Sequence, residues 1–268
     1  MVICYNSKNS MAYGAAKVAY TYGSYLLSGV EVEMSAYTIG FLKHSGFYLE
    51  LDDCILVFDY YQDPEGILDS LLADTVKDVY FFVSHRHYDH FNPEIAKFQN
   101  KAKSYFLHRD CEFSIEDMDK VHFLNVGDSH HAKHFSVRMY GSTDIGGSYL
   151  IQYKNRNIFH AGDLNWWHWS GESDRDNMAA RAFYFRELKR LKGLETDILF
   201  FPVDARQGEA REWGVRQFME TGTVKQLLVP MHAFGPAWKR SYAFRWRFPN
   251  VPVWIPQHDG EKYKGELV

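Results

Sequence analysis

The sequence predicts a single α/β domain in which a β-sheet is covered by helices on both faces. Short apolar runs recur from residue 35 onward, and many of them end in an acidic residue or a histidine. Continuous runs of this kind, without polar alternation, are typical of strands that are buried on both faces. Segments with helix start and stop signals separate the runs. A length of 268 residues is sufficient for one such domain with a substantial core.

Five apolar runs define the main expected strands. They are "CILVFDYY", which leads to Asp59, "VYFFVSH", ending at His85, "NIFHAGD", ending at Asp163, "DILFFPVD", ending at Asp204, and "QLLVPMH", ending at His232. The segment "SYLIQYKNRNIFHAGD" alternates around a polar turn at 154–157 and therefore predicts a hairpin.

Four segments between or after these strands predict helices. "DPEGILDSLLADT" and "NPEIAKFQNKA" begin with the expected N-caps Asp63 and Asn92, each followed by a proline. "SDRDNMAARAFYFRELKRLKG" predicts a long amphipathic helix with Phe183, Leu188 and Leu191 on one side. "EAREWGVRQFMETG" predicts another.

The composition argues against several classes of partner. The net charge is −4, and the lysines and arginines are scattered, which does not favour nucleic acid or an anionic membrane. No segment reaches the ~20 continuous apolar residues that a membrane-spanning helix needs. We therefore expect a small-molecule substrate, while the oligomeric state is left open.

The cysteines and the first residues bear on compartment and domain organisation. Cys4, Cys54 and Cys111 are too few and too far apart for a disulfide framework or a thiolate zinc site. They fit a reducing compartment, so we expect a cytoplasmic protein. Residues 1–33 do not match a secretory signal and are interpreted as an N-terminal extension of uncertain structure, followed by one domain over 34–268.

The stretch "SHRHYDHF" concentrates histidines directly after an expected strand. His85, His87, Asp89 and His90 follow the spacing H-x-H-x-D-H and precede a helix that begins with proline. Imidazole nitrogens together with a carboxylate are ligands that suit zinc and related divalent ions. A histidine-rich surface turn is the alternative, but four such residues after a buried strand favour a metal site.

This motif resembles the signature of the metallo-β-lactamase superfamily of metallohydrolases. The downstream motifs "HAGD" and "VPMHAFG" follow in the matching order, so that the resemblance covers roughly residues 36–258. It implies a four-layer αβ/βα sandwich, in which two sheets lie face to face with helices outside. It places the metals in a groove at one edge of the sandwich.

The resemblance also implies two divalent ions, with zinc expected and manganese or iron as alternatives. The first ion would be held by His85 and His87, the second by Asp89, His90 and His232, with Asp163 bridging the two. Two simpler interpretations remain open: Asp163 could cap the turn at Leu164, and His232 could be a histidine of the core.

One departure from the family concerns the first ion. The family usually supplies a third histidine from a stretch that reads "YGSTDIGGSYLI" here, without histidine. Asp144 or Ser142 falls on that position, depending on the direction of counting. Asp144 is preferred because a carboxylate binds such ions and a hydroxyl is a poor ligand at neutral pH; a polar turn capped by Asp144 is the alternative.

A bridged metal pair activates water, which predicts a hydrolase acting on an ester, lactone, amide or phosphodiester bond. Asp89 is the expected catalytic residue, which orients the water and takes its proton. Trp166, Trp167 and His168, in the loop after Asp163, are candidates for substrate binding.

Alternatives are a metal-binding protein without turnover, a mononuclear relative and a nuclease of the RNA-processing type. A di-iron oxidoreductase of the flavodiiron type is disfavoured, because those proteins resemble the same motif but carry glutamate where His87 stands. Two further histidines receive no ligand role. His44, in "LKHSGF", is interpreted as structural, and His160 as hydrogen-bonded to backbone.

Overall fold

The computed structural model describes residues 26–27, 30–31 and 34–268. Two compact units are distinguished, Met1–Met34 with Val268, and Ser35–Leu267, and each is described by itself. The described part of the first unit contains the antiparallel strands β1 (Leu26–Leu27) and β2 (Val30–Glu31). The extension expected over 1–33 otherwise lies outside the described residues, and the predicted boundary stays a prediction.

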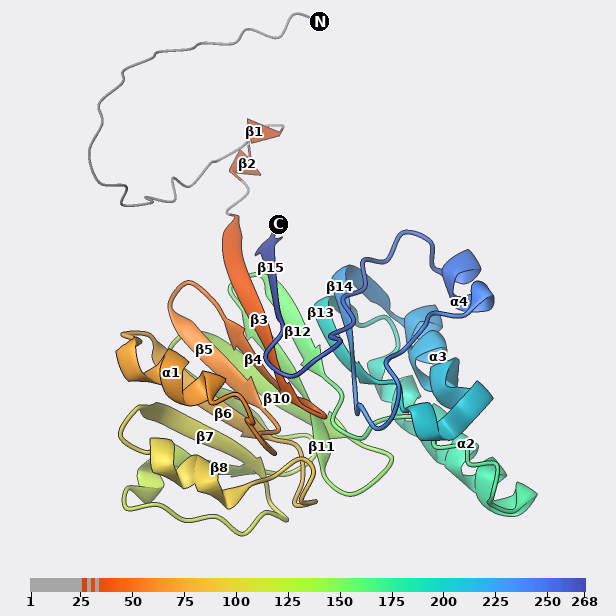
Figure 1. Cartoon of the computed structure of the whole chain (residues 1–268), viewed down its shortest axis with the longest axis horizontal. Helices are drawn as coiled ribbons and strands as arrows, with labels where there is room; N and C mark the ends of the chain where they lie inside the picture. Colours follow the sequence, from red (N-terminus) through yellow and green to blue (C-terminus); the bar gives the residue numbers. More distant parts are fainter. Residues whose placement is uncertain (1–25, 28–29, 32–33) are drawn as a thin grey trace, which may run out of the picture. The chain divides into compact units, whose positions relative to one another are not determined.

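Residues Ser35–Leu267 form two β-sheets with helices on their outer sides (Figure 1). In sheet order, the seven-stranded sheet contains β15 (Lys262–Leu267), β3 (Ser35–Lys43), β4 (Gly46–Glu50), β5 (Cys54–Phe58), β6 (Asp78–Val83), β7 (Ala102–His108) and β8 (Val121–Leu124). The six-stranded sheet contains β14 (Thr223–Met231), β13 (Glu195–Pro202), β12 (Arg156–His160), β11 (Gly147–Tyr153), β10 (Phe135–Gly141) and β9 (Ser129–His131).

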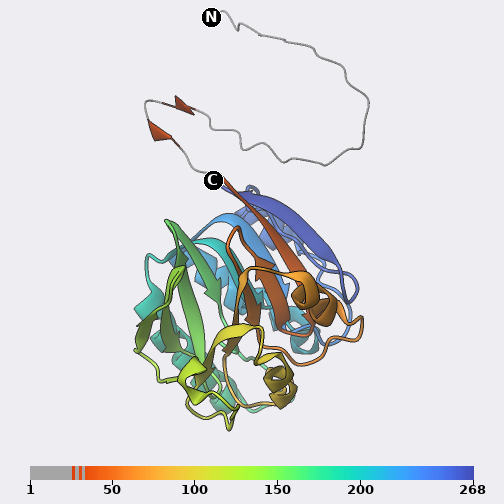
Figure 2. The same ribbon diagram turned by 90° about the vertical axis from the view of Figure 1, so that its left-hand side faces the viewer.

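Helices cover both sheets from outside. On one side lie α1 (Ile67–Asp74) and the 3-10 helix η1 (Pro93–Phe98), and Figure 2 shows α1 in front of its sheet. On the other side lie α2 (Asp174–Leu188), α3 (Trp213–Thr221) and α4 (Tyr242–Arg247). Three further 3-10 helices are η2 (Met118–Lys120), η3 (Lys189–Leu191) and η4 (Ala205–Glu212).

The strands that were expected to be buried on both faces are buried on both faces in the structure. In β5, Leu56 and Phe58 pack into the core between the sheets, whereas Ile55 and Val57 pack beneath α1 and η1. Both faces of this strand are therefore shielded from water, which explains its continuous apolar run. The predicted hairpin is also confirmed, since β11 and β12 pair antiparallel. The mixed α/β fold with two packed sheets and outer helices is confirmed. The expectation that helices cover both faces of a sheet was wrong, because the inner face of each sheet packs against the other sheet.

Three of the predicted helices differ in detail. α1 begins at Ile67, later than expected, although the Asp63 carboxylate still accepts hydrogen bonds from the backbone N–H groups of Ile67 and Leu68. The segment after Asn92 forms a short 3-10 helix instead of an α-helix. In α2 the expectation for Phe183 was wrong, because the buried face is formed by Tyr184 and Leu188 while Phe183 is half-exposed.

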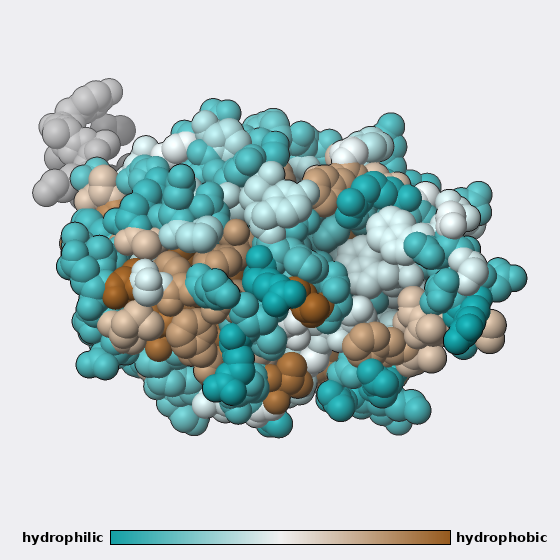
Figure 3. All heavy atoms as spheres, turned by 90° about the horizontal axis from the view of Figure 1, so that it is seen from below, coloured by the Kyte–Doolittle hydropathy of each residue, from teal (hydrophilic) through white to brown (hydrophobic). Residues whose placement is uncertain are grey.

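One face of the molecule is mainly polar. Figure 3 shows one face on which hydrophilic residues predominate and hydrophobic residues form separate patches. Among the described residues, no helix is long and apolar enough to cross a membrane.

Candidate metal centre

The predicted ligands come together because the strands that precede them end at neighbouring positions. β6 runs parallel to β5, and β12, β13 and β14 run parallel to one another. The carboxyl ends of parallel strands meet at one edge of a sheet, which brings Asp163 and His232 together after β12 and β14. His85 follows β6 of the other sheet, and the two sheets pack so that its Nε2 atom lies 3.5 Å from Asp163. His90 follows in the turn after His85, and all four side chains are buried.

Asp163 lies at the centre of this cluster. Its Oδ1 atom is 3.0 Å from His90 Nε2 and 3.4 Å from His232 Nε2, and its Oδ2 atom is 3.5 Å from His85 Nε2. Despite the short distance, His90 Nε2 and Asp163 Oδ1 have no hydrogen-bond partner. Buried polar atoms are rarely left unpaired. Nitrogens of three histidines that converge on one buried carboxylate fit a cation held between them.

The charges of the cluster depend on one another. Burial alone would raise the pKa of Asp163, but the charges of His90 and His232 hold it well below the usual range. Burial alone would lower the pKa of His90, but Asp163 and Asp59 raise it well above the ordinary value. Burial and the charge of His90 lower the pKa of His85 to about 4. His85 is therefore neutral at pH 7, and a neutral imidazole is the form that binds a metal.

Of the residues predicted for the first ion, His87 and Asp144 lie on the exposed side of the cluster, whereas His85 is buried. His87 Nδ1 is 3.1 Å from His85 Nε2 and 3.7 Å from Asp144 Oδ2. His87, Asp144 and Asp163 form one group whose donor atoms lie within 4.8 Å of one another. Ser142 is buried and is not among the residues that line the cavity above the cluster, whereas Asp144 lines it. The arrangement supports Asp144 as the residue in place of the missing histidine.

The residues assigned to the second ion form another group. Asp89, His90 and His232 each offer one donor atom within 4.8 Å of the others, and His44 is a fourth member. His44 was expected to be structural, and no spacing in the sequence connects it with the motif 41 residues later.

Two carboxylates that sequence reasoning noted only as strand ends support the predicted ligands. Asp59 accepts hydrogen bonds from the backbone N–H and the hydroxyl of Ser84, at 2.7 Å each, and lies 2.7 Å from His90 Nδ1. The Ser84 hydroxyl is in turn 2.9 Å from His85 Nδ1. Asp59 thereby orients the rings of two predicted ligands.

Asp204 has the same relation to His232. Its Oδ2 atom is 2.9 Å from His232 Nδ1, and both of its carboxylate oxygens accept hydrogen bonds from Nε of Arg206. Both acids follow a buried apolar strand, as Asp163 does, and this shared pattern was the signal available in the sequence. His160 does not orient a predicted ligand. Its Nε2 atom is 3.2 Å from the carbonyl oxygen of Ser45, as expected for a histidine hydrogen-bonded to backbone.

Backbone geometry explains the glycines around the centre. Gly146 has a φ of 84° and lies against His85, and a Cβ atom there would approach the Cβ of His85 to 2.3 Å. Gly162 has a φ of 52°, and its Cβ would lie 2.8 Å from the Cβ of Ser84. Only glycine permits this conformation and this close approach without strain.

A cavity of about 340 Å³ opens above the cluster. Its lining consists of His87, Asp89, Thr143, Asp144, Asp163, Trp167, Trp169, Arg206 and His232. The rings of Trp167 and Trp169 stack at 5.8 Å. Of the predicted substrate-binding residues, Trp167 lines the cavity, whereas the rings of Trp166 and His168 lie 5.1 and 4.7 Å from Trp213 and are not among the lining residues.

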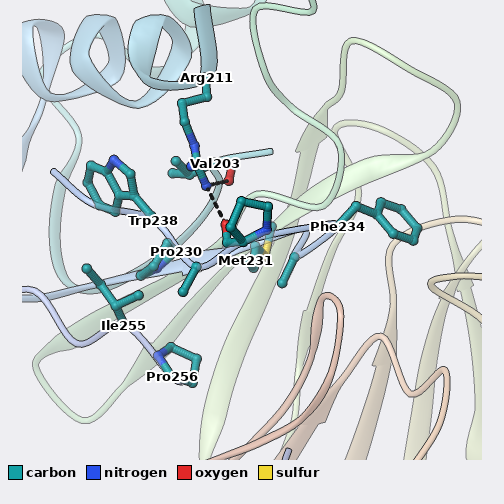
Figure 4. Close-up of a pocket in the computed structure, with 11 residues that line it drawn as sticks. Val203, Arg211, Pro230, Met231, Phe234, Trp238, Ile255 and Pro256 are labelled. Atoms are coloured by element: carbon teal, nitrogen blue, oxygen red, sulfur yellow. Dashed lines mark hydrogen bonds between the residues drawn. The ribbon is translucent and has the colours of Figure 1, made fainter. Parts of the chain in front are cut away.

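A second cavity lies beside the end of β14 (Figure 4). Its volume is about 30 Å³, which suits a water molecule and no larger ligand. The guanidinium of Arg211, which lines this cavity, donates hydrogen bonds to the carbonyl oxygens of Val203 and Pro236. The larger cavity is therefore the candidate site.

No family model and no curated protein matches the chain. Solved structures do match. Igni18, a metallo hydrolase from the hyperthermophilic archaeon Ignicoccus hospitalis, is 15% identical with a TM-score of 0.56, covering 87% of this chain and 100% of that one. The metallo-beta-lactamase fold protein YhfI from Bacillus subtilis is 14% identical with a TM-score of 0.51, covering 87% of this chain and 99% of that one.

A third similar structure is CmlA, a diiron beta-hydroxylase from Streptomyces venezuelae. It is 10% identical with a TM-score of 0.51, and the similarity covers 87% of this chain but 54% of that one. These similarities establish the fold, because structure is shared at identities too low to carry an activity across. The chain has the metallo-β-lactamase fold.

Proposed function

We propose that this chain, which has the metallo-β-lactamase fold, is a metal-dependent hydrolase with a dinuclear centre. Zinc is the proposed metal, with manganese or iron as alternatives. The observation that carries the proposal is the convergence of three histidine nitrogens on the buried Asp163 carboxylate, with His90 Nε2 at 3.0 Å, His232 Nε2 at 3.4 Å and His85 Nε2 at 3.5 Å. The similarity to metallo hydrolases such as Igni18 supports the same conclusion.

The residues divide into two proposed ligand sets around Asp163. His85, His87 and Asp144 are proposed for one ion, and Asp89, His90 and His232 for the other. The donor atoms of His87 and Asp144 group with Asp163, and those of Asp89, His90 and His232 with one another, while His85 groups with His90 and Asp163 and so lies between the two positions. Two metal ions bound at these positions would lower the pKa of a water molecule and polarise the bond to be cleaved. Asp89 lines the cavity and is the proposed residue that orients the water and accepts its proton.

The cavity favours a substrate with a planar or sugar-like part, carrying an ester, lactone, amide or phosphodiester bond. Trp167 and Trp169 present stacked rings beside the proposed ligands. For a hydrolysed substrate, Trp169→Ala is expected to raise KM about tenfold with little effect on kcat or metal content, because an aromatic contact contributes up to about 1.5 kcal/mol.

The control for this substitution is Trp166→Phe, because Trp166 packs against Trp213 and lies outside the lining of the cavity. It should leave KM unchanged. Steady-state kinetics on both variants checks the expectation, and an equal effect of the two substitutions on KM would contradict it.

Elemental analysis of untagged protein purified without chelator tests the dinuclear centre. We expect two zinc, manganese or iron ions per chain in the wild type and about one in Asp144→Ala, because that change removes a proposed ligand of the first ion. The matched control is Ser142→Ala, which removes the other candidate and should keep both ions.

The same measurement separates the alternatives. One ion or none, with no change in Asp144→Ala, would move the assignment to a mononuclear or metal-binding protein. Two ions in the wild type would justify a screen of esters, lactones, amides and phosphodiesters, with RNA as the substrate that would reveal a nuclease.

A further inference from the structure

His44 lies in the turn between β3 and β4, at the same edge as the metal centre. The strand pairing requires this position: β4 runs antiparallel to β5, so that Phe47 at the start of β4 pairs with Phe58 at the end of β5. The turn before β4 therefore lies beside the carboxyl ends of β5 and β6. Topology thus brings a histidine from far upstream in the sequence to the predicted ligands.

The backbone at His44 has an unusual conformation. Its φ is 58°, a value that L-residues adopt rarely, although histidine and asparagine tolerate it better than most. Among the described residues other than glycine, positive φ angles occur at His44, Asp59, Lys154 and His232. Three of these four positions are at the centre, and such conformations tend to be retained at functional sites.

Both ring nitrogens of His44 are buried without a hydrogen-bond partner. The side chain is 2% exposed and packs against the rings of His232 and Phe234, with centroids at 4.3 and 4.2 Å. A buried imidazole without partners is unfavourable. The nearby His160 is equally buried, yet Ser45 and Gly162 provide partners for both of its nitrogens. The fold therefore satisfies one buried histidine and leaves His44 with free nitrogens.

His44 has one nitrogen close to a residue proposed for the second ion. Its Nε2 atom is 3.5 Å from Asp89 Oδ2, without making a hydrogen bond. Donor atoms from His44, Asp89, His90 and His232 all lie within 4.8 Å of one another. Ligand atoms about 2.1 Å from a tetrahedral ion lie about 3.4 Å apart, so these donors need to converge by at most about 1.4 Å.

We propose that His44 is a ligand of the second metal ion, in addition to Asp89, His90, His232 and the bridging Asp163. This inference rests on the proposed dinuclear centre. The two positions would then differ from the family pattern in opposite ways. The first has Asp144 where the family has a histidine, and the second has His44 as an additional histidine ligand. The second position is buried and rich in imidazole, whereas His87 and Asp144 at the first are 42% and 44% exposed. The second position should therefore fill first.

The probe is cobalt(II), added to metal-depleted full-length protein labelled with 15N-histidine. NMR counts the histidine rings that show the large contact shifts of an imidazole bound directly to the ion, which are distinguished from the smaller through-space shifts of rings that are only nearby; competition with a chelator gives the affinity for each equivalent. The wild type should show shifted signals from five rings, namely His44, His85, His87, His90 and His232. At one equivalent, the signal of His44 should already be shifted.

The variant is His44→Asn, because asparagine tolerates the left-handed backbone but does not extend as far toward the centre. We expect the tighter of the two affinities to fall at least about 100-fold, since the loss of residues that only support a ligand already costs 10- to 100-fold. One shifted ring signal should disappear.

Two variants calibrate this result. His232→Asn has the same change at another left-handed position and should behave like His44→Asn, whereas His160→Asn should keep both affinities and all shifted signals. Four shifted rings in the wild type, or unchanged affinities in His44→Asn, would overturn the role of His44 and leave the dinuclear centre intact. Failure of the wild type to bind cobalt would overturn the centre itself.

Discussion

Asp163→Asn is expected to lower kcat/KM for a hydrolysed substrate by at least about 10³-fold, equivalent to about 4 kcal/mol of transition-state stabilisation. Its two carboxylate oxygens contact His90 and His232 on one side and His85 on the other. No other carboxylate in the described residues contacts histidines of both proposed ligand sets so closely. An amide keeps the shape but loses the charge that offsets two cations, so the metal content should also fall below two.

Asp197→Asn is the matched control for this loss. Asp197 is also buried and accepts hydrogen bonds from Asn157 and Gln226, but it lies at the amino-terminal end of β13, away from the centre. Its substitution should reduce stability without changing metal content or kcat/KM. Kinetics and elemental analysis on both variants decide the matter. Full activity in Asp163→Asn would exclude a bridging role for this carboxylate.

The main strands and most proposed ligands could be predicted because both depend on short-range patterns. An apolar run that ends in an acid or a histidine marks a buried strand and the residue at its end, and parallel strands bring such ends together. This pattern is visible in the sequence alone for His85, Asp163 and His232. It would also have pointed to Asp59 and Asp204, had every acid at a strand end been considered as a support for a ligand.

The remaining features depend on contacts that spacing in the sequence does not show. His44 reaches the centre through the pairing of β3, β4 and β5, and its distance from the motif along the chain conceals this. The choice between Asp144 and Ser142 depends on which side chain the loop before Gly146 directs into the cavity. Whether a tryptophan lines the cavity or packs against Trp213 also depends on tertiary packing, so the loop sequence alone could not separate these roles.

Asp59→Ala is expected to lower the free energy of unfolding of the metal-depleted protein by about 3 to 5 kcal/mol. Asp59 is 1% exposed, and its removal leaves Ser84 and His90 with buried donors that have no acceptor. Burial alone would raise the pKa of its carboxyl, but the charges of His160 and His90 hold that pKa below the usual range. The carboxylate is therefore ionised at pH 7, and the substitution removes a buried charge that compensates a protonated histidine.

Metal affinity should fall in the same variant by about 10- to 100-fold, because Asp59 orients His90 directly and His85 through Ser84. Urea denaturation with chelator present measures the first effect, and chelator competition on the folded protein measures the second. Asp59→Asn separates the loss of hydrogen bonds from the loss of charge. The amide keeps an oxygen that can accept a hydrogen bond from Ser84, but it carries no charge to compensate that on His90. If Asp59→Ala unfolds at the wild-type urea concentration and binds metal as tightly, the rings of His85 and His90 are held by their own packing instead.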